Sequence, residues 1–277
     1  MKRLAWILAL AVAAPPAAFA ADLGESAPSP VVAPAPASSP FDIGFGAKLM
    51  SDYNFRGITQ SDHGPSGGAY VEPRYGWFYA GVAAWAVKLP TQPTAEVDLY
   101  GGIRPTWGQF SADIGAIYYW YPRELPGTNT DFWEVYAKPS WSVTDWATIG
   151  ANVYYTPSFA QSGANGTYVS GTLKFNLPSV LPSKDIGWYT SGEFGHYFLG
   201  RTKAALGATN LPDYDFWNVG LAFTYKAFTL DFRYYDTDLS KRQCFMIAGN
   251  GAGPRSSWCG AAFIASLSID TSLSALK

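Results

Sequence analysis

Charge is scarce in this sequence of 277 residues, and its interior holds no long apolar run. Asp, Glu, Lys and Arg make up 14% of the chain, whereas an ordinary soluble domain has about 25%. The net charge of −2 gives no electrostatic reason to expect a nucleic acid as a partner. After the N-terminal segment, no stretch approaches the roughly 18 consecutive apolar residues of a membrane-spanning helix. These absences argue against a nucleic-acid-binding protein and against a helical membrane protein.

Cysteine and histidine are also rare, with two residues of each type. Cys244 and Cys259 lie close together near the C-terminus, and such a pair in an oxidising compartment predicts one disulfide. Closing a loop of about 15 residues would add roughly 3 kcal/mol of stability in the chain-entropy model. No spacing typical of zinc or calcium ligands occurs. We therefore expect neither a metal nor a cofactor.

Two features could suggest a hydrolase, and both have simpler interpretations. Residues 64–68 read GPSGG, which satisfies the G-x-S-x-G pattern, with His63 directly before it. A nucleophile elbow requires a strand, a sharp turn and then a helix, whereas this string lies between two expected strands. His196 is in register with Phe194 and Phe198 on an apolar face, and the sequence locates no serine or orienting partner for it. We expect the chain not to be an enzyme.

The N-terminus has the features of a secretory signal peptide. A basic start, MKR, is followed by the apolar run LAWILALAVAA and by the A-x-A string that ends at Ala20. This pattern predicts cleavage between Ala20 and Ala21, with residues 1–20 removed. Residues 21–40 are rich in proline, alanine and serine, which predicts a tail without fixed structure in the periplasm of a Gram-negative bacterium. The folded part is then expected over residues 41–277.

Apolar and polar residues alternate with a period of two through the rest of the chain, as in β-strands. The stretch DIGFGAKLMSDYNFRGITQSD begins at Asp42 and has two distinct faces. One face carries Phe45, Leu49, Tyr53 and Phe55. The other face carries Lys48, Asp52 and Arg56. The same alternation occurs in AEVDLYGGIRPTW and FTLDFRYYD, and no helical period competes with it.

Turn residues divide the folded part into about twelve expected strands. These span residues 42–57, 68–76, 78–89, 94–106, 109–121, 131–143, 146–157, 166–177, 186–198, 213–225, 227–238 and 260–275. The connections between them alternate between long and short. Bacterial outer-membrane barrels have an even number of strands, short periplasmic turns and long external loops. With the first strand starting in the periplasm, every long connection would lie outside the cell.

A secreted β-sandwich would show a similar alternation of apolar and polar residues. Three features favour a barrel: the length of the strands, the charged sets on the polar faces, and the aromatic residues near strand ends, which are typical of membrane interfaces. We therefore predict an all-β fold, a closed antiparallel transmembrane β-barrel of about 12 strands in the outer membrane. Its expected partners are outer-membrane lipid and, during biogenesis, the barrel-assembly machinery.

Several strings also resemble a known family. These are SDYNFRGITQSD, GIRPTWG, TYVSGTLKFNLP, WNVGLAFTYKAFTLDFRYYDTDLS and WCGAAFIASLSID. They are similar to the TorF-type family of proteobacterial porin-like proteins, first catalogued as conserved proteins of unknown function. The resemblance extends from Phe41 to the C-terminus and implies an outer-membrane barrel. It brings no catalytic or ligand-binding residue with it.

In such a barrel the polar faces of the strands would line the lumen. The charged residues predicted to line the pore are Lys48, Asp52, Arg56, Glu72, Arg74, Glu96, Asp98, Arg104, Asp113, Glu134, Lys138, Lys174, Glu193, Asp231 and Arg233. They could pair across strands and stabilise the lumen, or line a hydrated pore and set its selectivity. Both interpretations stay open, and the nearly balanced signs predict no preference between cations and anions.

The number of strands limits how wide a pore the barrel can enclose. Eight strands leave an interior filled by side chains, whereas sixteen or more leave an aqueous channel. About twelve strands therefore predict a narrow pore, partly occluded by inward residues or a folded-in loop. We expect a passive channel for small polar solutes. The alternatives are a non-conducting structural or adhesive barrel, an outer-membrane lipid hydrolase and a soluble periplasmic sandwich.

Overall fold

The computed structural model describes residues 40–178, 185–249 and 254–276. The predicted signal peptide, its cleavage site between Ala20 and Ala21, and nearly all of the predicted tail lie outside the described residues. None of the helices in the described ranges has the length and apolar character needed to cross a membrane.

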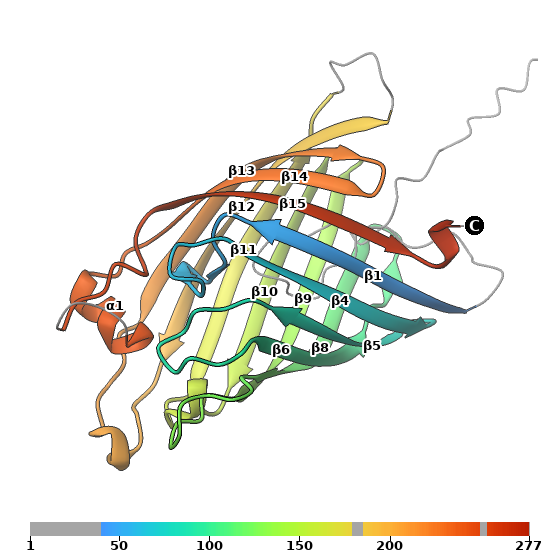
Figure 1. Ribbon diagram of the computed structural model, residues 1–277. Coiled ribbons are helices and arrows are strands. Elements are labelled where there is room, and N and C mark those ends of the chain that lie inside the picture. The colour runs from blue at the N-terminus through green and yellow to red at the C-terminus, as the bar shows by residue number, and fades with distance from the viewer. Residues whose placement is uncertain (1–39, 179–184, 250–253, 277) are drawn as a thin grey trace, which may run out of the picture.

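Thirteen strands of the described chain form a single sheet, and one of them, β7 (Thr106–Trp107), is only a short extension beside β8. The other twelve run antiparallel to their neighbours (Figure 1). They are β1 (Phe41–Met50), β4 (Ser66–Tyr75), β5 (Phe78–Trp85), β6 (Glu96–Ile103), β8 (Phe110–Trp120), β9 (Phe132–Thr144), β10 (Ala147–Thr156), β11 (Gly166–Asn176), β12 (Ile186–Leu199), β13 (Tyr214–Tyr225), β14 (Phe228–Thr237) and β15 (Ala262–Ser272).

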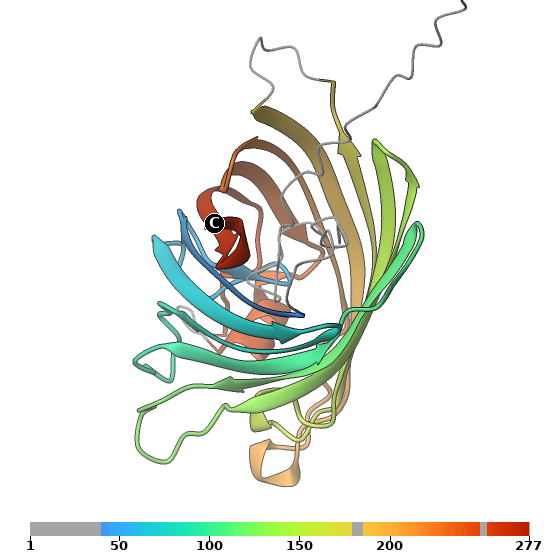
Figure 2. The ribbon, with the colours of Figure 1, turned by 90° about the vertical axis from the view of Figure 1, so that its right-hand side faces the viewer.

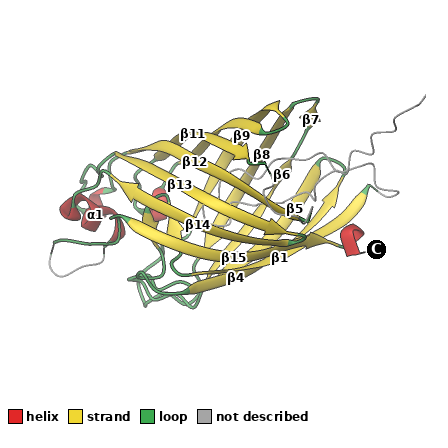
Figure 3. Cartoon of the chain, turned by 90° about the horizontal axis from the view of Figure 1, so that it is seen from above, coloured by secondary structure: helices red, strands yellow, loops and turns green. Residues whose placement is uncertain are grey.

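The sheet closes on itself. β1 pairs with β15, the last strand, and β6 pairs with β8, so each of the twelve long strands has two neighbours. Figure 2 looks along the resulting barrel, and Figure 3 shows its strands side by side between the α1 end and the C-terminal end. The predicted closed, antiparallel, all-β architecture is confirmed.

Burial is inverted relative to a soluble protein. Along β11, buried Ser170, Thr172 and Lys174 alternate with exposed Val169 and Leu173. Successive side chains of a strand point to opposite faces, so the polar set of β11 faces the barrel interior and the apolar set faces outward. The same inversion places Glu134 inside at 0% exposure. A protein whose charges are inside and whose large apolar side chains are outside needs an apolar surrounding.

Exposed aromatic side chains gather where the short turns join the strands. Trp77 and Trp107 meet edge to face at 6.4 Å between ring centroids. Phe110 stacks on Trp141 at 5.4 Å, on the outer face of β8 and β9. Aromatic rings at this position are typical of a membrane–water interface.

The first expected strand is the main error of the sequence interpretation. It was predicted to extend over residues 42–57, but β1 ends at Met50. A small hairpin follows, formed by β2 (Asn54–Phe55) and β3 (Ile58–Thr59). Arg56 and Gly57 form its turn, and both have positive φ (46° and 84°), as the preferred two-residue hairpin turns require. We call residues 51–65 the inserted segment.

Because the strand ends at Met50, the aromatic residues that follow it do not face outward as expected. Tyr53 and Phe55 were expected to face lipid together with Phe45 and Leu49. Tyr53 is instead buried at 2% exposure, and Phe55 is half-buried against the ring of Tyr119. The period of two continues in the sequence after the strand has ended, because a turn built on Asn54, Arg56 and Gly57 interrupts the sheet without changing the spacing of the aromatic residues.

A charged substitution at Leu49 tests whether the outer face of the barrel contacts lipid. It is 68% exposed on β1, and a charge on the lipid face of a barrel costs up to about 2–4 kcal/mol for Arg. We expect Leu49→Arg to lower the free energy of unfolding in lipid vesicles, measured by urea titration, and to reduce heat-modifiable gel migration. Leu49→Ala is the matched control and should assemble. Equal stability of Leu49→Arg and the parent would place this face in water.

Candidate functional site: the lumen and its inserted segment

The inserted segment crosses the barrel from β1 to the opposite wall. Arg56, at its tip, forms two hydrogen bonds with the carboxylate of Glu134 on β9, both 2.8 Å long. The hydroxyl of Tyr214 on β13 donates to the carbonyl oxygen of Arg56 at 3.0 Å. Arg56 and Glu134 are 1% and 0% exposed. A bidentate arginine–carboxylate pair of this kind fixes both position and orientation.

Five tyrosines form a platform under Arg56, and we call them the tyrosine row. They are Tyr136, Tyr154, Tyr168, Tyr197 and Tyr214, one each on β9 to β13 and in direct register from strand to strand. Adjacent ring centroids lie 5.3–6.3 Å apart. The guanidinium carbon of Arg56 lies 4.6 Å from the rings of Tyr154 and Tyr168 and 5.0 Å from that of Tyr197. Each such cation–π contact adds about 0.5–2 kcal/mol.

The base of the inserted segment is anchored separately. Tyr53 donates from its hydroxyl to Glu96 at 2.5 Å, and Tyr121 donates to the other oxygen of the same carboxylate at 2.7 Å. Within the segment, Asp52 accepts hydrogen bonds from the hydroxyls of Thr59 and Ser61 at 2.5 and 2.9 Å. The segment is therefore bonded internally and to the wall at two places, and it does not hang freely in the lumen.

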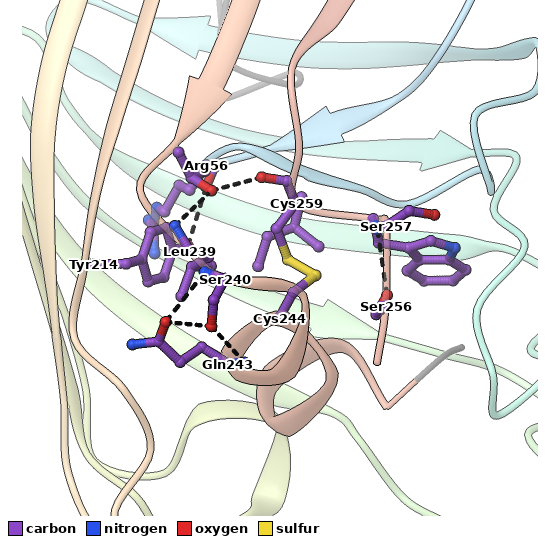
Figure 4. The surroundings of a disulfide bond; sticks show 12 residues. Arg56, Tyr214, Leu239, Ser240, Gln243, Cys244, Ser256, Ser257 and Cys259 are labelled. Atoms are coloured by element: carbon purple, nitrogen blue, oxygen red, sulfur yellow. Dashed lines mark hydrogen bonds between the residues drawn. A yellow bond between two sulfur atoms is a disulfide. The ribbon is translucent and has the colours of Figure 1, made fainter. Parts of the chain in front are cut away.

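A disulfide-stapled loop at the α1 end of the barrel holds the inserted segment in place. The predicted bond between Cys244 and Cys259 is present and ties α1 (Lys241–Ala248) to the start of the last strand (Figure 4). Trp258, next to this bond, donates from its indole nitrogen to Asp62 at 2.9 Å. Its carbonyl oxygen accepts from the backbone nitrogen of Thr59 at 3.0 Å. The connection after β1 and the connection before β15 thus meet at this end of the lumen.

One charge network lies on the wall formed by β4, β6, β8 and β9. Arg104 donates to Glu72 at 2.6 and 3.1 Å and to Asp113 at 3.0 Å. Arg74 donates to Glu72 at 2.5 Å, and the ammonium of Lys138 lies 3.5 Å from Asp113. Three cations share two carboxylates. The carboxylates are buried, while the side chains of the cations retain 12–18% exposure toward the interior.

A second network lies on the wall formed by β1 and β11 to β15. Arg233 on β14 bonds Asp231 at 2.9 and 3.2 Å, and it also donates to the hydroxyl of Ser191 at 2.8 Å. Lys174 on β11 is buried on the same wall, and Lys48 on β1 is half-buried. Asp270 on β15 and Glu193 on β12 are the other carboxylates of this wall, so its cations and carboxylates are equal in number.

Other inward carboxylates bond neutral donors. Asp98 accepts from the indole nitrogen of Trp85 at 3.1 Å. Glu193 accepts from Asn152 at 2.9 Å and from the hydroxyl of Tyr168 at 3.0 Å. Ion pairs across strands therefore account for only part of the inward charge.

All fifteen charged residues predicted to line the pore face the interior, but two of them do so from a different element. Asp52 and Arg56 were expected on the first strand and belong to the inserted segment. Glu72, Arg74, Glu96, Asp98, Asp113, Glu134, Lys138, Lys174, Glu193, Asp231, Arg233 and Lys48 lie on strands, and Arg104 directly follows β6. Whether they line a conducting path remains a prediction.

Sequence reasoning missed the tyrosine row and the contact between Asp62 and Trp258. The aromatic residues near strand ends were expected at the membrane interfaces, but five of them are buried inside: Tyr79, Tyr119, Tyr121, Tyr154 and Tyr235. A signal was available for Tyr154, because it is in phase with the polar residues Asn152 and Thr156 of β10 and out of phase with exposed Val153. The loop contact has no sequence signal, since its partners are 196 residues apart.

The residues of the two hydrolase motifs are bound to other groups. Ser66 of the GPSGG string opens β4, and its hydroxyl donates to the carbonyl of Ala86 at 2.6 Å. His63 lies 3.2 Å from Asp52, within the inserted segment. His196 is on the outer face of β12, and its Nδ1 lies 2.6 Å from the carboxylate of Asp215 on β13.

Removing one partner of the Arg56–Glu134 pair should be costly. Arg56→Ala leaves a buried carboxylate without its cation, and breaking a buried ion pair in this way costs about 3–5 kcal/mol. We expect a loss of that size in the free energy of unfolding, measured by urea titration of the folded barrel. The double variant Arg56→Met/Glu134→Gln is the control and should lose less. A parent-like midpoint for Arg56→Ala would show that the pair does not hold the segment.

The disulfide should keep the external end of the lumen closed. In Cys244→Ser/Cys259→Ser the loop is no longer stapled, and about 3 kcal/mol of chain-entropy stabilisation is lost. We expect trypsin to cleave at Lys241 or Arg242 faster in this variant, followed by mass spectrometry. Reductant should accelerate cleavage of the parent and leave the variant unchanged. Equal cleavage of oxidised parent and variant would contradict the role given to the staple.

Comparison with known proteins gives a family and a set of distant structures. Solved structures that match include the KdgM porin in complex with disordered oligogalacturonate, at 10% identity, with 82% of this chain and 98% of that chain covered and a TM-score of 0.47. OmpT of Vibrio cholerae, in its trimer form, matches at 10% identity, 84% and 98% coverage and a TM-score of 0.38. No curated protein matches. The matching family model covers residues 34–256, and the chain belongs to this family, described as bacterial protein of unknown function (Gcw_chp).

Proposed function

We propose that the barrel spans the bacterial outer membrane, after export with a cleaved signal peptide, and admits small polar solutes by passive diffusion. The observation that carries this proposal is the inverted burial of a closed sheet. Large apolar side chains such as Leu49 and Phe263 are exposed on the outside, whereas the charged networks are inside. Closed barrels satisfy every backbone hydrogen bond without solvent, which is the condition for crossing lipid with strands.

The inward cations support a hydrated path below the inserted segment. Arg74, Arg104 and Lys138 keep part of their surface accessible although the carboxylates between them are buried. In a lumen filled only for stability, these charges would be desolvated at a high cost in free energy. Rings of charged side chains beside water are the usual lining of selective pores.

A non-conducting structural or adhesive barrel is the second candidate. The buried Arg56–Glu134 pair and the stapled loop favour it, because together they hold the inserted segment across the lumen. A lipid hydrolase has weaker support, since the hydroxyl of Ser66 is buried and bonded to a backbone carbonyl. We propose that the chain is not an enzyme.

Single-channel recording in planar bilayers decides between the two barrels. We expect discrete conductance steps from purified parent protein and larger steps from Arg56→Ala, because the tip of the segment is released. Heat-modifiable migration confirms that each sample is folded. Persistent silence from folded parent and folded Arg56→Ala would contradict a channel and favour the structural barrel.

A further inference from the structure

Lys174 is a buried lysine without a carboxylate partner in the described part of the chain. It faces the interior from β11 and is 5% exposed. Its ammonium nitrogen lies 3.8 Å from the centroid of the Tyr189 ring. The charged side chain that acts on it is Arg233, which has the same sign. Burying an ammonium beside another cation is unfavourable unless an anion compensates it.

Arg233 is held in a fixed position beside this lysine. It bonds Asp231, the hydroxyl of Ser191 and, at 2.6 Å, the side-chain oxygen of Asn218. Its guanidinium lies across Gly220, where a Cβ atom would approach its central carbon to 2.8 Å. Glycine at this position therefore lets Arg233 extend from β14 over β13 to β12. A site with this geometry is built before any ligand arrives.

Unused hydrogen-bonding atoms lie on the same wall. The Nδ2 atom of Asn218 and the hydroxyl oxygen of Thr172 are buried without a hydrogen-bond partner among the described residues. Lys174 pairs directly with Ser191 in the register of β11 and β12, and Thr172 is the next inward residue along β11. Buried polar groups without partners are uncommon in native proteins, and here two of them accompany an uncompensated cation.

The carboxylates of this wall are shared among other cations. Asp231 bonds Arg233, and both Asp231 and Asp270 act on Lys48. Glu193 on β12, the third carboxylate of this wall, accepts hydrogen bonds from the neutral side chains of Asn152 and Tyr168. Each of these carboxylates therefore has other partners, and no carboxylate pairs with Lys174 within the described residues.

We propose that this wall binds an anionic group of a passing solute, a carboxylate or a phosphate, through Lys174, with Ser191, Asn218 and Arg233 around it. An ammonium offers three donors on a flexible stem, and the neighbouring hydroxyl and amide supply neutral donors for further oxygens. This inference rests on the proposed channel function and names the class of solute.

Isothermal titration calorimetry on folded, detergent-solubilised protein tests the site without requiring conduction. The three probes are glucose, gluconate and glucose 6-phosphate, which differ in carrying no anion, a carboxylate and a phosphate. We expect gluconate, glucose 6-phosphate or both to bind the parent, while glucose gives no signal. Lys174→Met should weaken this binding about tenfold or more, which corresponds to roughly 1.4 kcal/mol.

Three variants control the test. Lys174→Arg keeps the charge and should retain binding, and Lys226→Met removes a cation from the turn between β13 and β14 and should bind like the parent. Lys174→Gln replaces Lys174→Met if the latter fails to show heat-modifiable migration. Absence of anion binding to folded parent, or equal loss in Lys174→Met and Lys226→Met, would overturn the site. A silent bilayer recording with intact anion binding would instead contradict the channel alone.

Discussion

Once β1 pairs with β15 and β6 with β8, every long strand of the described chain has two neighbours, and the two faces of the sheet become an inside and an outside. Because side chains alternate along a strand, each strand residue then faces either the lumen or the outside of the barrel. Charged residues such as Glu134 and Lys174 are placed inside at low exposure. Each inward charge consequently needs a partner, because partly desolvated charges are costly when alone.

The partners come from three sources, and this explains the organisation of the lumen. Two networks use opposite charges on the barrel wall. Arg104 bonds Glu72 on β4 and Asp113 on β8, whereas Arg233 bonds Asp231 on its own strand. Other carboxylates use neutral donors such as the indole of Trp85. Glu134 receives its cation from the inserted segment, so a connection between two strands becomes part of the electrostatic balance of the opposite wall.

The sequence was sufficient for the strands and insufficient for the inserted segment, for physical reasons. The sequence predicts correctly that Lys174 faces inward and Leu173 outward, because lysine and leucine prefer opposite environments. Tyrosine is amphipathic and fits either the membrane interface or a polar interior, so Tyr53, Tyr121 and Tyr154 could not be placed by composition alone. The Arg56–Glu134 and Asp62–Trp258 contacts join residues 78 and 196 positions apart, and no local pattern reports such distances.

The contact between Asp62 and Trp258 joins the two ends of the folded part of the chain. Asp62 belongs to the first external connection and Trp258 to the last, and the strands beside them, β1 and β15, form the seam of the barrel. The hydrogen bond between Asp62 and Trp258 joins the connections on the two sides of this seam, so it requires both ends of the folded part of the chain to be in place. A barrel with an unpaired seam would lack this hold on the inserted segment and keep the bonds of Arg56 and Tyr53 to the wall.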